Sequence, residues 1–275
     1  MAIIGFALAV AAAVWFGAAT TEAPGPSQRN QQSTEEETPA EQEPAKPPQV
    51  DLQPTIDTWV TEQSGNYGIV VYDPANEAII ASHQPDEQFF TASIYKLYVA
   101  YLTLKDFQSG AQDPDEVILA GQTRKECVYK MIHSSDSPCG ETILNDIGQA
   151  TLGQRLKSEL DFKATNFPGF TTSSGDVVRL LARLQAKDDL NGANTKFLLD
   201  AMRTQIYRTG LPQGMPDTKV ANKVGFDSPD LWVDCGIITL PDGRDYVVSI
   251  FGNGGVGSSQ IRSFGSTIYA KLAEN

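Results

Sequence analysis

Hydrophobic and polar positions follow two different periods along the chain. Alternation typical of strands appears in five runs, beginning near Tyr67, Glu77, Lys219, Leu231 and Asp245. Helical spacing marks residues 53–65 near the start and 259–274 at the end. Most of the five runs are joined by short turns, which favours antiparallel pairing. The pattern predicts an α+β fold of the α/β sandwich type, with a five-stranded antiparallel sheet flanked by N- and C-terminal helices.

A long helix-rich stretch, about residues 90–212, separates the second strand-like run from the third. It predicts a helical lobe inserted into the sheet. With 41% hydrophobic residues, the chain can bury a sizeable core in two closely packed lobes. We therefore expect one domain over residues 53–275, with its functional cleft between the lobes.

The first fifty residues have a different character from the rest. Residues 2–19 are apolar and uncharged, long enough for a membrane span or for a signal peptide. The length of the run and the absence of Lys or Arg before it favour a retained signal-anchor, whereas the small residues at 17–19 favour cleavage. Residues 20–52, rich in Pro, Glu and Gln, predict a disordered tether. Both fates of the first segment imply export. A retained segment would anchor the domain to the membrane, and a cleaved one would release it as a secreted protein.

The overall charge of the chain argues against some classes of binding partner. The formal net charge is −13, and no basic face emerges along the sequence. Such a chain repels phosphate backbones, which argues against nucleic acid as a partner. No cofactor and no metal are expected, and we expect a monomer.

Candidate chemistry begins with Ser93, which lies at the start of a helical pattern that runs to Gly110. A helix start favours an oxyanion beside it. Lys96 follows one turn later on the same face. Histidine is the usual base for a serine nucleophile, but the chain contains only two, so a desolvated lysine is the better candidate. Burial and a second cation, for which we propose Lys223, would lower the pKa of Lys96.

Two further motifs complete an ordered set. Ser135-Asp136-Ser137 forms a polar break between two predicted helices, and Lys223-Val224-Gly225 lies on the third predicted strand. Taken singly, each has an ordinary explanation as a cap, a turn or an edge-strand lysine. Their shared order and spacing favour a common site.

Together the three motifs resemble the S-x-x-K, S-D-N and K-T-G signatures of the serine β-lactamase and penicillin-binding (D,D-peptidase) superfamily. The resemblance covers nearly all of residues 53–275 and is strongest to the class A β-lactamase-like branch, which implies a β-lactamase/transpeptidase-like fold. It implies that Ser93 is the acyl-enzyme nucleophile, Lys96 a proton acceptor, Ser135 the relay to the leaving nitrogen and Lys223 a partner for the substrate carboxylate.

The same resemblance assigns substrate binding and the oxyanion hole. Ser137 and Gly225 are expected to contact substrate, and the backbone N–H groups of Ser93 and Phe226 to form the oxyanion hole. It further implies a bacterial cell-envelope location and, as partners, a peptidoglycan stem peptide or a β-lactam, with the membrane contacted through the N-terminal segment.

Three departures from the family pattern affect the expected activity. Ser137 replaces the usual asparagine, and Val224 replaces a threonine or serine whose hydroxyl would bind the substrate carboxylate. The loop over residues 162–170 contains no acid to activate a deacylating water, so Glu159 and Asp161 are the nearest candidates. One positioned base contributes about 10²- to 10⁴-fold. We therefore expect a D,D-peptidase-like enzyme that deacylates β-lactams slowly. The alternatives are a class A-like β-lactamase and a non-catalytic envelope module that retains the fold.

Cysteines leave their pairing open. Cys127 and Cys139 bracket the Ser135 loop, and a disulfide between them would stabilise it by about 3 kcal/mol. Cys235 would then remain unpaired. The sequence allows any of three pairings, or three free thiols.

Overall fold

The computed structural model describes residues 50–227 and 229–274, all within the compact unit Ala45–Asn275. Five strands form one sheet in the order β2-β1-β9-β8-β7, and each neighbouring pair is antiparallel. This confirms the predicted five-stranded antiparallel sheet. The strands are β1 (Asn66–Asp73), β2 (Ala78–His83), β7 (Lys219–Asp227), β8 (Leu231–Thr239) and β9 (Asp245–Asn253).

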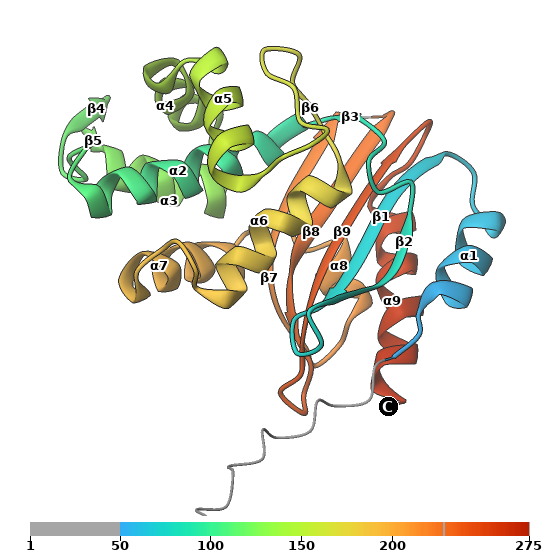
Figure 1. Cartoon of the computed structure of the whole chain (residues 1–275). Coiled ribbons are helices and arrows are strands. Elements are labelled where there is room, and N and C mark those ends of the chain that lie inside the picture. The colour runs from blue at the N-terminus through green and yellow to red at the C-terminus, as the bar shows by residue number, and fades with distance from the viewer. Residues whose placement is uncertain (1–49, 228, 275) are drawn as a thin grey trace, which may run out of the picture. The chain divides into compact units, whose positions relative to one another are not determined.

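The two terminal helices and a short third helix cover one face of the sheet (Figure 1). Trp59 packs edge-on against Phe264, with the ring centroids 5.2 Å apart. Ile69 and Val71 of β1 belong to this core, whereas Val70 between them belongs to the core on the opposite face, because alternate strand residues face opposite sides. The terminal helices are thus confirmed. The three helices are α1 (Gln53–Glu62), α8 (Leu211–Gly214) and α9 (Ser258–Ala273).

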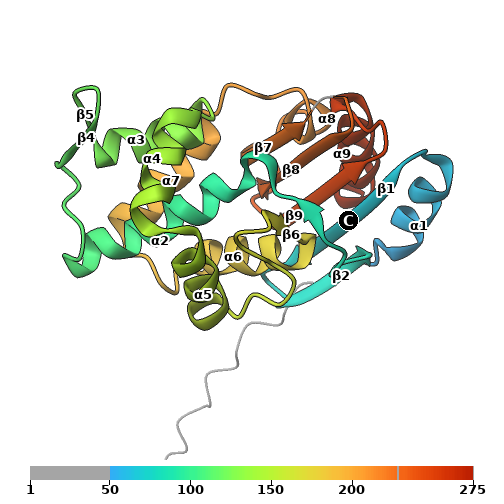
Figure 2. The ribbon, with the colours of Figure 1, turned by 90° about the horizontal axis from the view of Figure 1, so that it is seen from above.

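The helical lobe lies on the other side of the sheet, as Figure 2 shows from above. Helix α6 packs against β1 and β9, and α7 packs against β7. Two minor two-stranded sheets, which the sequence analysis did not predict, pair β3 (Phe89–Phe90) with β6 (Thr171–Thr172) and β4 (Val117–Leu119) with β5 (Gln122–Thr123). The helices of the lobe are α2 (Tyr95–Ser109), α3 (Arg124–His133), α4 (Ser137–Ile147), α5 (Gln149–Leu160), α6 (Ser174–Ala186) and α7 (Gly192–Arg203).

Helix α2 is the centre of the lobe. Every residue from Tyr95 to Leu104 is buried, so the helix is covered on all sides, as expected for a helix that is apolar around most of its circumference. It ends at Gly110, whose left-handed backbone (φ 74°) favours glycine. A short 3₁₀ turn, η1 (Ala92–Ile94), precedes it, so Ser93 lies in this turn and the α-helix itself begins two residues later.

The folded domain begins before the boundary predicted at residue 53. Val50 and Leu52 are buried, and the Leu52 N–H donates a hydrogen bond to the Ile80 carbonyl (3.3 Å). Residues 50–52, which the prediction assigned to the tether, therefore belong to the folded domain. The rest of the predicted tether and the apolar run at residues 2–19 lie outside the described residues. In the part of the chain that is described, no helix has the length and hydrophobicity needed to cross a bilayer.

Candidate active site

The three sequence motifs meet at one point between the sheet and the helical lobe. Lys96 Nζ lies 3.1 Å from Ser93 Oγ, 3.1 Å from Ser137 Oγ and 2.7 Å from the Ser135 carbonyl. Lys223 Nζ lies 3.0 Å from Ser135 Oγ. Side chains separated by up to 130 positions are therefore linked in one polar cluster, with Ser135 between the two lysines.

Ser93 is positioned by a turn and by the neighbouring strand. Ala92, just before it, has a left-handed backbone (φ 42°), a conformation that costs energy for a residue with a side chain and that clusters at functional sites. A Cβ added at Gly225 would lie 3.0 Å from the Ser93 nitrogen, so β7 approaches η1 too closely for any side chain there. The close approach places Phe226, the next residue of β7, beside Ser93.

The Ser135 loop is fixed from both sides. Ser135 also has a left-handed backbone (φ 56°), and Asp136 caps α4 by accepting the Cys139 N–H at 2.9 Å. The cap holds Ser137 in the first turn of α4, where its hydroxyl reaches Lys96. Serine at this position thus retains the contact with the lysine, while the amide expected from the family pattern is absent.

Burial dominates the electrostatics of both lysines. Lys96 is 1% exposed, and burial lowers the pKa of its ammonium, an effect that the charges of Glu141 and Asp136 partly oppose. Lys223 is fully buried, and burial followed by the charge of Lys96 lowers its pKa to about 7. The lysine assigned from sequence as the second cation is therefore itself close to neutrality at physiological pH.

A buried carboxyl group lies on the neighbouring strand. Asp234 of β8 accepts hydrogen bonds from Asn222 Nδ2 (2.8 Å) and the Leu211 N–H (2.9 Å), and burial raises its pKa to about 7. Neither lysine is bonded to this carboxyl group. The lysines thus depend on hydroxyl and carbonyl oxygens for their hydrogen bonds.

Ser93 and Lys96 line an open cleft of about 500 Å³, although Lys96 itself is almost completely buried. Four aromatic residues contribute to its walls, and the only carboxylate among its lining residues is Glu141 of α4. In the described residues, no group of three or more His, Cys, Asp or Glu side chains could hold a metal ion. The aromatic lining residues are Phe90, Tyr95, Phe170 and Phe226.

A comparison with protein-family models matches residues 51–272 to the β-lactamase enzyme family. The chain belongs to this family. It is thus a β-lactamase-like serine hydrolase by descent, as the three motifs indicated. No curated protein is similar to it at a significant level.

Solved structures with the same fold include both branches of the superfamily. PBP-A superposes with a TM-score of 0.73 at 24% identity, covering 84% of this chain and 99% of that one. A PBP-A variant solved as an acyl-enzyme complex with penicillin G gives a TM-score of 0.73, 23% identity and coverage of 84% and 100%. An ancestral class A β-lactamase (GNCA) gives 0.71, 21% identity and coverage of 80% and 99%. These likenesses establish the β-lactamase-like fold.

In this β-lactamase-family chain the loop over residues 162–170 brings one aromatic ring, Phe170, to the cleft. The buried Asp176 carboxylate accepts the backbone N–H groups of residues 163–165 at 2.8–2.9 Å, which fixes the loop at the start of α6. Phe170 lines the cleft and packs edge-on against Phe167, with centroids 5.2 Å apart. The sequence analysis correctly found no acid in this loop, but it did not identify Asp176 as the residue that holds it.

The two acids nearest to that loop in sequence do not line the cleft. Glu159 forms ion pairs with Lys105 (2.8 Å) and Arg155 (2.7 Å), and Asp161 is exposed and pairs with Lys163. The acid that does line the cleft, Glu141, was missed. Its sequence signal was its position four residues after Ser137 on the same helix, which places both on one face.

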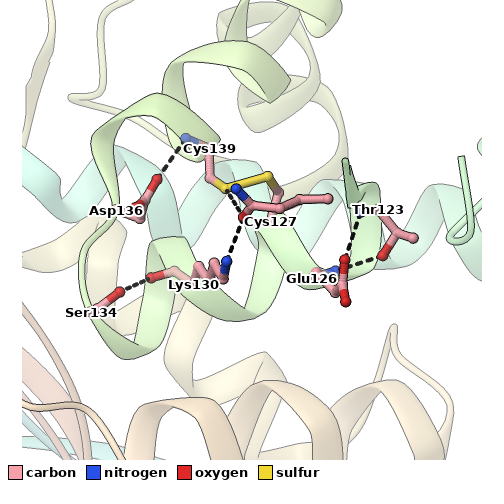
Figure 3. The surroundings of a disulfide bond; sticks show 8 residues. Thr123, Glu126, Cys127, Lys130, Ser134, Asp136 and Cys139 are labelled. Atoms are coloured by element: carbon pink, nitrogen blue, oxygen red, sulfur yellow. Dashed lines mark hydrogen bonds between the residues drawn. A yellow bond between two sulfur atoms is a disulfide. The ribbon is translucent and has the colours of Figure 1, made fainter. Parts of the chain in front are cut away.

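A disulfide joins Cys127 of α3 to Cys139 of α4 (Figure 3), and Cys235 is buried and unpaired. The bond connects the helices on either side of the Ser135 loop, and Asp136 hydrogen-bonds to the backbone of Cys139 itself. Of the three pairings that the sequence allowed, the structure contains the one that restrains this loop.

Replacing both Cys127 and Cys139 with alanine should destabilise the domain by about 3 kcal/mol, because the cross-link limits the freedom of the unfolded chain. The measurement is equilibrium denaturation of the oxidised protein and the double variant. Cys235→Ala is the control, since it removes a thiol but no cross-link. An equal loss in the control and the double variant would contradict the role of the disulfide.

Proposed function

We propose that the protein is an acyl-transferring serine enzyme of the D,D-peptidase type, acting on peptides that end in D-Ala-D-Ala. The observation that carries the proposal is the continuous chain of polar atoms from Ser93 Oγ through Lys96 Nζ and Ser135 Oγ to Lys223 Nζ. A module that had kept only the fold for binding would not require two buried lysines at this cost in solvation. The assembled chain therefore supports a catalytic role over a binding role.

Acylation follows from this geometry. Ser93 Oγ attacks the carbonyl carbon while its proton passes to the neutral amine of Lys96, 3.1 Å away. The proton then moves through Ser135 to the departing nitrogen, so the C–N bond breaks as the ester forms and the leaving group departs as an amine. The backbone N–H groups of Ser93 and Phe226 stabilise the oxyanion.

Lys223 has a second role in this proposal, as the partner of the substrate carboxylate. Its Nζ donates to Ser135 Oγ at 3.0 Å and to the Val224 carbonyl at 2.7 Å. Val224 supplies no hydroxyl beside it, and a hydrogen bond to a charged group contributes about 1.5–3 kcal/mol. Carboxylate recognition is accordingly weaker than in relatives with threonine or serine at that position.

Slow deacylation of β-lactams follows from the composition of the cleft. The loop over residues 162–170 carries no acid and contributes the Phe170 ring to the cleft instead. A peptide donor loses its leaving amine, so water or an acceptor amine can approach the ester. A β-lactam retains its leaving group in the adduct and shields the carbonyl. The penicillin G acyl-enzyme of a structurally similar protein supports such an adduct here.

β-Lactamase activity is the second candidate. The observation that favours it is the Glu141 carboxylate, which lines the cleft together with Ser93. A carboxylate so placed could serve as the base for hydrolysis of the adduct. The lifetime of the adduct separates the two candidates.

We also propose that the domain works outside the cytoplasm, in a bacterial cell envelope, held to the membrane by residues 2–19 through the tether. The disulfide supports this location, because such bonds persist mainly in oxidising compartments. The apolar composition of the first segment supports it independently.

The second-order rate constant for acylation of Ser93 should rise as pH increases through about 7. Lys223 has a pKa lowered to about 7, and the lysine pair must lose one proton before it can accept that of Ser93. The measurement is adduct formation with benzylpenicillin followed by intact mass spectrometry across this range. In Lys223→Ala the rise near pH 7 should disappear, because the lysine whose pKa is about 7 is then absent. A pH-independent rate around neutrality in the unmodified protein would refute the lysine-base mechanism.

Incubation with benzylpenicillin should produce one covalent adduct, on Ser93, that persists for many minutes. Peptide mapping locates the adduct, and Ser93→Ala, which lacks the nucleophile, should remain unmodified. Regeneration of free enzyme within seconds would identify a β-lactamase instead. Absence of an adduct at high concentration would favour a non-catalytic module.

The full-length chain, produced in a bacterium, should sediment with membranes and be degraded by protease added outside the cytoplasmic membrane. Deletion of residues 2–19 should leave it soluble and protected inside the cell, because export then has no signal. Recovery of the full-length chain from the cytoplasm would contradict the proposed location.

A further inference from the structure

One face of α4 forms a wall of the cleft. Ser137, Glu141 and Asn145 are spaced four residues apart, so they lie on the same side of the helix, and all three line the cleft. Ser137 contacts Lys96 directly, at 3.1 Å. Glu141 is therefore one helical turn from the residues that surround the nucleophile.

The position of α4 leaves little freedom for this wall. A Cβ added at Gly140 would lie 3.0 Å from Lys96 Cε, so the helix backbone is in van der Waals contact with the lysine stem. The Asp136 cap and the Cys127–Cys139 disulfide fix the start of the same helix. Glu141 thus projects from a rigid support rather than from a mobile loop.

The Glu141 carboxylate has no partner of its own. Within residues 50–227 and 229–274 it makes no hydrogen bond and no ion pair, whereas Asp136 caps a helix and Glu159 is paired with two cations. Lys96, the nearest cation, is already bonded to the oxygens of Ser93, Ser135 and Ser137. The negative charge of Glu141 therefore faces the open cleft without a direct partner, although it also acts on Lys96 and opposes the lowering of the pKa of that ammonium.

The remaining lining residues are also suited to a cation. Tyr95 and Phe170 meet edge-on with centroids 5.7 Å apart, and Phe90 is 47% exposed. The faces of aromatic rings attract ammonium groups. Gln149 contributes a neutral amide, whose oxygen can accept from an ammonium. A carboxylate, aromatic faces and an amide oxygen together favour an organic ammonium over a metal ion or an anion.

We propose that this part of the cleft is a subsite for a positively charged amine carried by the acyl donor, with Glu141 as its partner. The proposal rests on the acylation of Ser93 proposed above and adds the substrate class: donors with a free ammonium group on the acyl side, in preference to neutral or anionic ones. Glu141 determines specificity here and takes no part in the transfer of the acyl group.

Three penicillins that share one nucleus test the subsite: ampicillin, with an ammonium on its side chain, benzylpenicillin, with none, and carbenicillin, with a carboxylate. The readout is the rate constant for adduct formation on Ser93, at low salt and at a pH below the pKa of the ampicillin amine. An exposed ion pair contributes about 0.2–1 kcal/mol and a cation–π contact about 0.5–1 kcal/mol, so ampicillin should react roughly 3- to 30-fold faster than benzylpenicillin, and carbenicillin more slowly.

Glu141→Gln, which keeps the shape and removes the charge, should lower this preference to the roughly 2- to 5-fold that the cation–π contact alone provides, and Glu141→Lys should reverse it. Glu62→Gln on α1 is the matched control, because it removes the same charge from an exposed site outside the cleft and should retain the preference. High salt should weaken the preference of the unmodified protein.

The outcomes separate this proposal from the one on which it rests. Equal rates for the three penicillins would overturn the subsite and leave the acyl-transfer function intact. Failure of all three to form an adduct would overturn both. Slower regeneration of Glu141→Gln after every penicillin, with unchanged selectivity, would assign the carboxylate to deacylation and overturn the subsite.

Discussion

The Lys96 ammonium, almost completely removed from solvent, is hydrogen-bonded to oxygens from two elements of the helical lobe. Burying such a group is unfavourable unless every donor finds an acceptor. Ser93, the Ser135 carbonyl and Ser137 satisfy that requirement only while η1 and the α3–α4 loop keep their relative positions. Much of the architecture around the site can be understood as maintaining this arrangement.

Several features of the fold serve it directly. The glycine at 225 allows β7 to pack against η1, and the glycine at 140 allows α4 to pack against the lysine stem. The Asp136 cap and the disulfide restrain the loop between α3 and α4. Because the lobe and the sheet each supply one lysine, the pKa of Lys223 depends on how closely the two are packed.

The placement of acids around the cleft affects its electrostatics. Asp176 holds the loop over residues 162–170, and that loop presents the Phe170 ring to the cleft. The carboxylate that lines the cleft comes from helix α4 instead. In the functions proposed above, the cleft combines a serine nucleophile with a wall that attracts cations, so the charge of the donor influences how fast it reacts.

Local patterns in the sequence determined much of the fold. Strand alternation located all five main strands, helical spacing located both terminal helices, and the three motifs identified the residues that the structure brings together. Such signals are readable because alternation and helical spacing arise from backbone geometry within a few residues. The two-residue strands β3, β5 and β6 and the three-residue β4 were missed because each is too short to show a period. Burial of Val50 and Leu52 was missed for a different reason: it depends on contact with β2, which lies later in the chain, so no local pattern indicates it.

Only the tertiary structure decided which cysteines pair, which lysine is nearer neutrality and which acid lines the cleft. The pKa of Lys223 depends on complete burial and on Lys96, 127 positions away in the chain. Glu141 differs from Glu159 and Asp161 in what surrounds it, and its spacing of four residues from Ser137 shows only which face of the helix it shares, not that this face lines the cleft. Burial and charge–charge interactions act through space, so residues distant in sequence set them, whereas the residue types able to do the chemistry were already determined by the sequence itself.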